Sequence, residues 1–320
     1  MLCMQVRLEF PWIGQFLASH LAFHLTLIIL LFSLYFPDYD AGLNFTSFPP
    51  YTGSIEATPK VLAEAYEKQL QNPAYASFLR NSNNITVFGT YDDHDYGVNN
   101  GDKTYKHAKH AALAFLKFTG ESKASPMYKR AERGYGLYGV KMFDFSRPAG
   151  QELVSDEEAA IDPDVVVSRN ISSRRYLHKT VAIFVLDCRT NKTPWRKTSP
   201  DYEGDMLGER QWQWFEAAIK NSRAEVNVIV NGLQVHPDVR LPDPNIYERW
   251  GAFPSARQRL YDAILQEGVK APLLISGDVH MSQLMRKDCY KWDPVSYRML
   301  PATSRRALIE LTTSGMTHSW

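Results

Sequence analysis

The feature that most constrains the fold of this chain is a series of short apolar runs that each end in a polar or charged cluster. The runs are Ile85–Phe88, Val181–Leu186, Val226–Val230, Leu273–Ser276 and Ala307–Leu311. Continuous runs of this length are typical of strands in a sheet that is covered on both faces. In layered α/β folds, ligands bind at the carboxyl ends of the strands, which is where the polar clusters of this chain fall.

Segments with the spacing of amphipathic helices separate these runs. They are Pro59–Gln71, Lys103–Phe118, Gly208–Asn221 and Pro254–Glu267. Thr58 followed by Pro59 predicts the start of the first helix, with Thr58 as its N-cap. Strands and helices that alternate predict an α/β fold, and we expect one domain over residues 58–320 after an N-terminal segment, residues 1–57. The formal net charge of +1 gives no indication of a nucleic-acid partner.

Four ionisable side chains, Asp92 to Asp95, stand in a row just after the first apolar run. Carboxylates and an imidazole at the end of a strand suit a hard or borderline metal ion. By itself, such a cluster is also compatible with a solvated acidic turn. A second cluster, Gly277-Asp278-Val279-His280, follows another apolar run and makes a metal site the favoured interpretation.

The two clusters together suit a hydrolytic metal centre. We predict Asp93, Asp278 and His280 as metal ligands, with Asp92 as a further candidate ligand. His94 is predicted to act as the acid or to contact phosphate. A metal ion lowers the pKa of bound water to about 7, and two ions about 3.5–4 Å apart can clamp a phosphoryl group.

Two other strand ends carry candidate residues. Gln234 or Asn231, after the run that ends at Val230, could add a neutral oxygen ligand. Arg189 follows the run that ends at Leu186, and it either forms a structural ion pair or faces an anion as a catalytic residue. Cys188, beside it, is predicted to be a buried small apolar residue rather than a nucleophile.

The N-terminal residues 21–36 are nearly all apolar. This run is long for the apolar part of a signal peptide and short for a membrane span. Three interpretations are open: a signal anchor or uncleaved signal with membrane association, a buried strand or helix of the fold, and a wrongly predicted exon. Acceptor sequons at Asn44, Asn84, Asn170 and Asn191 favour a glycoprotein of the secretory pathway, membrane-anchored or extracellular.

Five motifs, in order along the chain, carry a resemblance to a known family. They are Tyr91–Asn99 (W-D-D-H-D-Y-G-x-N), Leu186–Arg189 (L-D-x-R), Met206–Trp212 (m-L-G-x-x-Q-w), Ser276–His280 (S-G-D-V-H) and Thr313–His318 (S-S-G-x-T-H). From about Thr58 onward, the sequence resembles the PhoD-like alkaline phosphatases, a branch of the calcineurin-like metallophosphoesterases.

The resemblance implies a four-layer α/β/β/α sandwich with mixed sheets and a centre of two metal ions, Fe, Mn, Zn or Ca. It implies hydrolysis of small-molecule phosphate mono- or diesters. Asp93 and His94 would match the Asn-His of the wider superfamily's G-N-H-D/E motif. Asp278 and His280 would match its G-H-x-H.

The sequence departs from the family pattern in its first part. The family's G-S-C strand and G-D-x-x-Y strand end, which supply ligands for the first metal, are not in the sequence, and Asp38-Tyr39-Asp40 stands at about the second position. The alternative function is therefore a catalytically impaired relative that binds a phosphate ligand or serves as a membrane-anchored glycoprotein.

Overall fold

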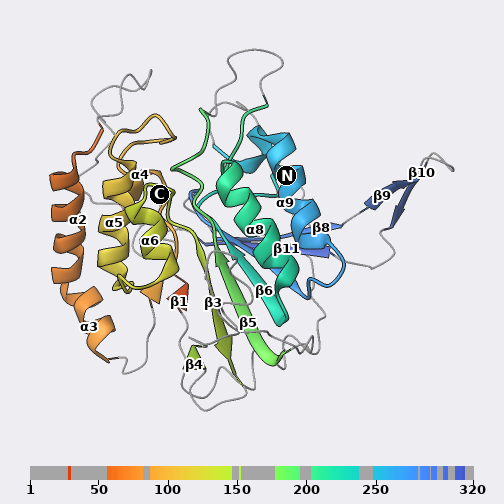
Figure 1. Ribbon diagram of the computed structural model, residues 1–320, viewed down its shortest axis with the longest axis horizontal. Coiled ribbons are helices and arrows are strands. Elements are labelled where there is room, and N and C mark those ends of the chain that lie inside the picture. The colour runs from red at the N-terminus through yellow and green to blue at the C-terminus, as the bar shows by residue number, and fades with distance from the viewer. Residues whose placement is uncertain are drawn as a thin grey trace.

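A seven-stranded mixed sheet forms the centre of the described part of the chain (Figure 1). The structure is a computed structural model that describes residues 28–29, 56–81, 87–145, 151–152, 177–194, 203–237, 248–279, 282–288, 290–293, 298–301 and 307–313. The strands, in spatial order, are β4 (Gln151–Glu152), β3 (Gly139–Asp144), β5 (Leu177–Val185), β6 (Ala224–Val230), β7 (Pro272–Ser276), β11 (Ala307–Thr312) and β8 (Gln283–Asp288).

The four central strands of this sheet, β5, β6, β7 and β11, are parallel, and their neighbours β3 and β8 are antiparallel to them. The central four coincide with four of the predicted apolar runs, so that prediction is confirmed. Ile183, Phe184 and Val185 of β5 are all fully buried. Consecutive residues of a strand point to opposite faces, so burial of all three shows that both faces are covered at β5.

One face of the sheet packs against α8 (Glu209–Asn221) and α9 (Pro254–Leu265) (Figure 1). Trp250 of the 3₁₀ turn η1 (Trp250–Ala252) belongs to the same apolar core. Phe184 of β5 meets Phe215 of α8 edge to face, with ring centroids 5.9 Å apart. The predicted helices at these positions are confirmed, and Gly208 is the N-cap of α8.

The other face carries a short second sheet and then helices. Phe88 of β2 (Val87–Phe88) stacks on Phe143 of β3, with ring centroids 5.9 Å apart. Tyr91, just after β2, contacts Phe115 of the helix α5 (Ala108–Thr119) edge to face. The helices of this layer are α2 (Pro59–Gln71), α3 (Pro73–Asn81), α5 (Ala108–Thr119) and α6 (Pro126–Glu132), at the left of Figure 1. The order of helices, short sheet, large sheet and helices agrees with the predicted α/β/β/α fold.

The helix predicted at Lys103–Phe118 begins later, at Ala108. Asp102 accepts hydrogen bonds from the backbone N–H and the hydroxyl of Thr104, at 2.9 and 2.7 Å. A side chain that captures a nearby N–H favours a turn over a helix, so the chain turns there first.

The apolar N-terminal run contributes the strand β1 (Ile28–Ile29), which pairs in parallel with β2. Of the three interpretations of this run, a strand of the fold is the one that these two residues show. Within the described ranges, no helix has both the length and the apolar character that a membrane span requires. The rest of the run lies outside the described residues, as do Asn44, Asn84 and Asn170.

A two-stranded antiparallel ladder completes the described strands. It pairs β9 (Tyr290–Asp293) with β10 (Arg298–Pro301).

The fourth sequon asparagine, Asn191, is half-buried, and its side-chain nitrogen donates to the carbonyl of Tyr135 at 3.0 Å. That nitrogen, to which a glycan would be joined, is therefore engaged with the protein.

Candidate metal centre

The acidic cluster forms one short helical turn, α4 (Asp93–Tyr96), directly after β2. The Asp95 side chain accepts the backbone N–H of Asp92 at 3.3 Å, which caps the start of the turn. Gly97 ends it with φ +108°, a left-handed conformation that glycine adopts at little cost. Asp95 therefore has a local structural role, and Asp92 and Asp93 remain as the candidate ligands from this cluster.

The fold brings three of the predicted ligands, Asp92, Asp93 and Asp278, together. One carboxylate oxygen of each residue lies within 4.8 Å of the corresponding oxygens of the other two. Asp278 follows β7 and has φ +71°, a left-handed conformation that a non-glycine residue rarely adopts. Such conformations cost roughly 1–3 kcal/mol and occur most often at functional sites. The fourth predicted ligand, His280, lies outside the described residues.

Asp93 is held rigidly by backbone groups. Its two carboxylate oxygens accept N–H groups of His94 at 2.7 Å and of Asn100 at 2.8 Å. Burial raises the pKa of Asp93, but His94, Arg189 and these two N–H groups together bring the pKa below its ordinary value. Asp93 is therefore the carboxylate of the three that most readily stays ionised.

His94 stands at the edge of the cluster. Its side chain is 17% exposed, and Nε2 lies 3.8 Å from Oδ1 of Asp93. The imidazole therefore lies beside the carboxylate of Asp93 and is partly exposed to solvent, a position that suits a group that meets a substrate.

Asp92 uses its two carboxylate oxygens differently. Oδ1 accepts a hydrogen bond from Nε of Arg189 at 3.1 Å and another from Nη2. Oδ2 is buried and has no partner at ordinary hydrogen-bond geometry among the residues that the structure describes, although the Asp92 side chain also faces the backbone N–H of Asp95 in a capping box. An unsatisfied buried acceptor is destabilising by about 1–3 kcal/mol and calls for an ion, a water molecule or a ligand.

The electrostatics of the cluster fit a cation. Burial raises the pKa of Asp92 to about 6, although Arg189 lowers it. Burial, followed by the charges of Asp92 and Asp93, raises the pKa of Asp278 well above its ordinary value. Like charges that are buried together are stabilised by a bound cation, and carboxylate oxygens are common ligands of divalent metal ions. The three described carboxylates therefore fit a metal ion, and the identity and number of the ions stay predictions.

Arg189 forms the structural ion pair, one of the two predicted alternatives. Its side chain is fully buried and pairs with Asp92 and Glu248. Glu248 also pairs with Lys192, which is fully buried as well. The role of Arg189 as a catalytic residue that faces an anion stays a prediction. Glu248 and Lys192 were not predicted, because neither belongs to one of the five family motifs or to a strand end.

The two predicted neutral ligands, Asn231 and Gln234, form hydrogen bonds with different residues of the protein. Oδ1 of Asn231 accepts the indole N–H of Trp250 at 2.8 Å and the N–H of Leu233 at 3.1 Å. Asn231 therefore fixes the loop after β6. The Gln234 amide nitrogen donates to Thr312 at 2.9 Å and Gln283 at 3.2 Å, and its role as a metal ligand stays a prediction.

Asp187 joins the end of β5 to the end of β2. Its Oδ2 accepts hydrogen bonds from the hydroxyl of Tyr91 at 2.7 Å and from the N–H of Leu137 at 2.7 Å. Cys188, beside it, is fully buried, which confirms the prediction of a buried small residue. Burial raises the pKa of this thiol far above its ordinary value, so it is not poised as a nucleophile.

Comparisons with known proteins give a matching family and a similar solved structure. Residues 64–319 match the family of PhoD-like phosphatases. A similar solved structure, titled "Structure of PhoD", shares 18% sequence identity with a TM-score of 0.43, over 80% of this chain and 45% of that chain. This chain thus spans less than half the length of that protein. No curated protein matches the sequence.

Proposed function

This chain belongs to the PhoD-like phosphatase family, and on that premise we propose that it hydrolyses small phosphate esters at a metal site formed by Asp92, Asp93 and Asp278. The observation that carries the proposal is the meeting of these three carboxylates, one of which has a buried, unpartnered oxygen. A structural ion-pair network would satisfy that oxygen internally, whereas a metal site leaves it for the ion.

Each residue has a distinct task in this proposal. Asp92 offers Oδ2 to the ion, while Arg189 neutralises Oδ1. Asp93 and Asp278 complete the described ligands, and His280 is the predicted further ligand two residues after Asp278. When bound, a metal ion would polarise a phosphoryl oxygen and lower the pKa of a coordinated water molecule.

His94 is the proposed general acid. Its partly exposed ring beside Asp93 places a proton donor at the solvent edge of the carboxylate cluster. A positioned imidazole that protonates a leaving oxygen contributes roughly 10²–10⁴-fold to a rate. The same ring could instead donate a hydrogen bond to a phosphate oxygen, and both tasks require the position that it has.

The experiment that tests this proposal measures Mn²⁺-dependent hydrolysis of aryl phosphate mono- and diesters by the full chain. Asp278→Ala should abolish turnover while the circular dichroism spectrum stays native. The matched control is Asp262→Ala, because Asp262 is an exposed aspartate on α9, outside the carboxylate cluster. Wild-type turnover in folded Asp278→Ala would disprove the proposed site.

A second candidate function is phosphate-ligand binding without turnover. The observation that favours it is the lack of the family's first-metal motifs in the sequence. In this case, phosphate would raise the melting temperature of the Mn²⁺-loaded protein, and no ester would be hydrolysed. Metal-dependent turnover would exclude this candidate.

A further inference from the structure

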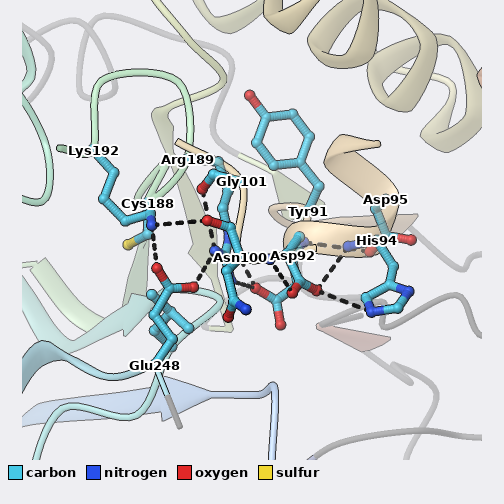
Figure 2. Close-up of polar contacts among 12 residues, drawn as sticks. Tyr91, Asp92, His94, Asp95, Asn100, Gly101, Cys188, Arg189, Lys192 and Glu248 are labelled. Carbon is cyan, nitrogen blue, oxygen red and sulfur yellow. Dashed lines mark hydrogen bonds and ion pairs between the residues drawn. The ribbon is translucent and has the colours of Figure 1, made fainter. Parts of the chain in front are cut away.

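Four buried charged side chains form an unbroken chain of contacts behind the carboxylate cluster (Figure 2). Lys192 pairs with Glu248, Glu248 with Arg189, and Arg189 with Asp92. The four side chains are between 0% and 5% exposed. The chain of contacts begins at Lys192 on the loop after β5 and passes through Glu248, two residues before η1. It then returns to Arg189 on the loop after β5 and ends at Asp92, a proposed metal ligand.

The geometry of Arg189 decides which oxygen of Asp92 is left open. Both Nε and Nη2 donate to the same oxygen, Oδ1. An arginine that faces a carboxylate freely tends to bind both oxygens with two parallel hydrogen bonds. Here Nη1 donates hydrogen bonds to Glu248 and, at 3.3 Å, to the carbonyl of Gly101. These two hydrogen bonds fix the plane of the guanidinium group.

We infer that Glu248 and Lys192 are positioning residues for the metal ligand Asp92. Lys192 holds Glu248, and Glu248 holds the guanidinium of Arg189 in the orientation that binds Oδ1 and leaves Oδ2 of Asp92 to the metal ion. This inference rests on the proposed function, because it assigns the two residues a task at the same site. Groups that orient metal ligands in this way typically change metal affinity by 10–100-fold when they are replaced.

The balance of charge supports this assignment. Asp92 and Glu248 are two anions, and Arg189 and Lys192 are two cations, so the four side chains sum to zero formal charge. The two remaining carboxylates, Asp93 and Asp278, then match the charge of one divalent cation. A buried ion network is by itself weak evidence for stability, because apolar residues of similar volume often serve as well. Orientation of a ligand gives the network a use that apolar residues could not supply.

The experiment measures Mn²⁺ affinity of the full chain by isothermal titration calorimetry. Glu248→Gln keeps the size of the side chain and removes its charge, and we expect Mn²⁺ to bind 10–100-fold more weakly. The matched control is Glu121→Gln. Glu121 forms a less deeply buried ion pair with Lys141 at 3.2 Å, outside this chain of contacts, so its replacement should leave the affinity unchanged.

A double-mutant cycle separates positioning from general destabilisation. In an Asp92→Asn background, titrated to millimolar Mn²⁺, Glu248→Gln should cause no further loss, because the residue through which it acts is already changed. An equal loss in both backgrounds would overturn the inference. Lys192→Met should weaken Mn²⁺ binding, whereas Lys192→Arg, which keeps the positive charge, should bind Mn²⁺ as the wild type does. This pair of variants tests the positioning role if Glu248→Gln does not fold.

The outcomes distinguish this inference from the proposed function. A wild-type chain that binds Mn²⁺, together with a folded Glu248→Gln variant of unchanged affinity, would overturn the positioning role and leave the metal site standing. A wild-type chain that takes up no Mn²⁺ would overturn both.

Discussion

Replacement of Gly232 by alanine tests how tightly the ligand Asp92 is confined. Gly232 follows β6, and a Cβ placed there would lie 3.0 Å from Oδ1 of Asp92, 3.2 Å from the carbonyl oxygen of Tyr91 and 3.4 Å from Cγ of Asp92. Ordinary contacts begin at 3.4 Å, so the structure must open by about 0.4 Å, the difference between 3.4 and 3.0 Å. Overpacking of this kind typically destabilises a protein by about 1–3 kcal/mol.

Both routes by which the structure could relax would displace a ligand. If the carboxylate of Asp92 moves, it strains the hydrogen bond from Nε of Arg189, now 3.1 Å long. If the backbone of Gly232 moves instead, it disturbs the hydrogen bond that its carbonyl accepts from the N–H of Gly277, at 3.1 Å, next to Asp278. We therefore expect Gly232→Ala to weaken Mn²⁺ binding by about tenfold, which is about 1.4 kcal/mol.

The assay compares Mn²⁺ affinity by calorimetry with the melting temperature of the same preparation. The control is Gly139→Ala in β3, whose new Cβ would meet Cε of Met127 at 2.8 Å. That atom is the end of a flexible side chain outside the carboxylate cluster, so stability should fall modestly and Mn²⁺ affinity should not change. Wild-type affinity in folded Gly232→Ala would refute the argument that Asp92 is both a ligand and tightly confined.

Two further predictions concern other parts of the chain. The buried thiol of Cys188 should resist iodoacetamide at pH 8 in the native protein and react only after unfolding, because burial raises its pKa. Peptide mass spectrometry measures the labelling of Cys188 in the two states, and equal labelling rates would contradict the prediction. Ile28→Cys combined with Val87→Cys should form a disulfide under mild oxidation, because the two residues are paired partners of adjacent strands about 4.8 Å apart. The off-register pair Ile29→Cys and Val87→Cys is the control, and equal or greater cross-linking of that pair would refute the register of β1.

Much of the fold and part of the site could be predicted from local sequence. Apolar runs without alternation predicted the four parallel strands, because such runs are stable only where both faces of a sheet are covered. Thr58 before Pro59 predicted the start of α2. Asp93 and Asp278 could be placed at one site, because each follows an apolar strand whose end lies at the same edge of the fold.

Other features depend on contacts that local sequence does not encode. The apolar run 21–36 left three interpretations open, a signal anchor, a buried strand or helix, and a wrongly predicted exon. Only the pairing of Ile28 with Val87 and of Ile29 with Phe88 places two of its residues in a sheet. The motif that contains Arg189 allowed either an ion pair or an anion-facing role. The structure shows the ion pairs of Arg189 with Asp92 and Glu248, which no local pattern could have revealed, and its anion-facing role stays a prediction.

The sequence by itself determined which residue types stand at the strand ends, because hydrophobic period and strand length are local properties that nearby residues specify. Only the tertiary structure decided which oxygen of Asp92 is open and which residues hold it. Arg189 lies 97 residues from Asp92, and Glu248 lies 59 residues from Arg189 and 56 from Lys192. No pattern in the sequence relates residues so far apart. Packing of the loops decides which buried charges meet, because each must find a partner once it is removed from water.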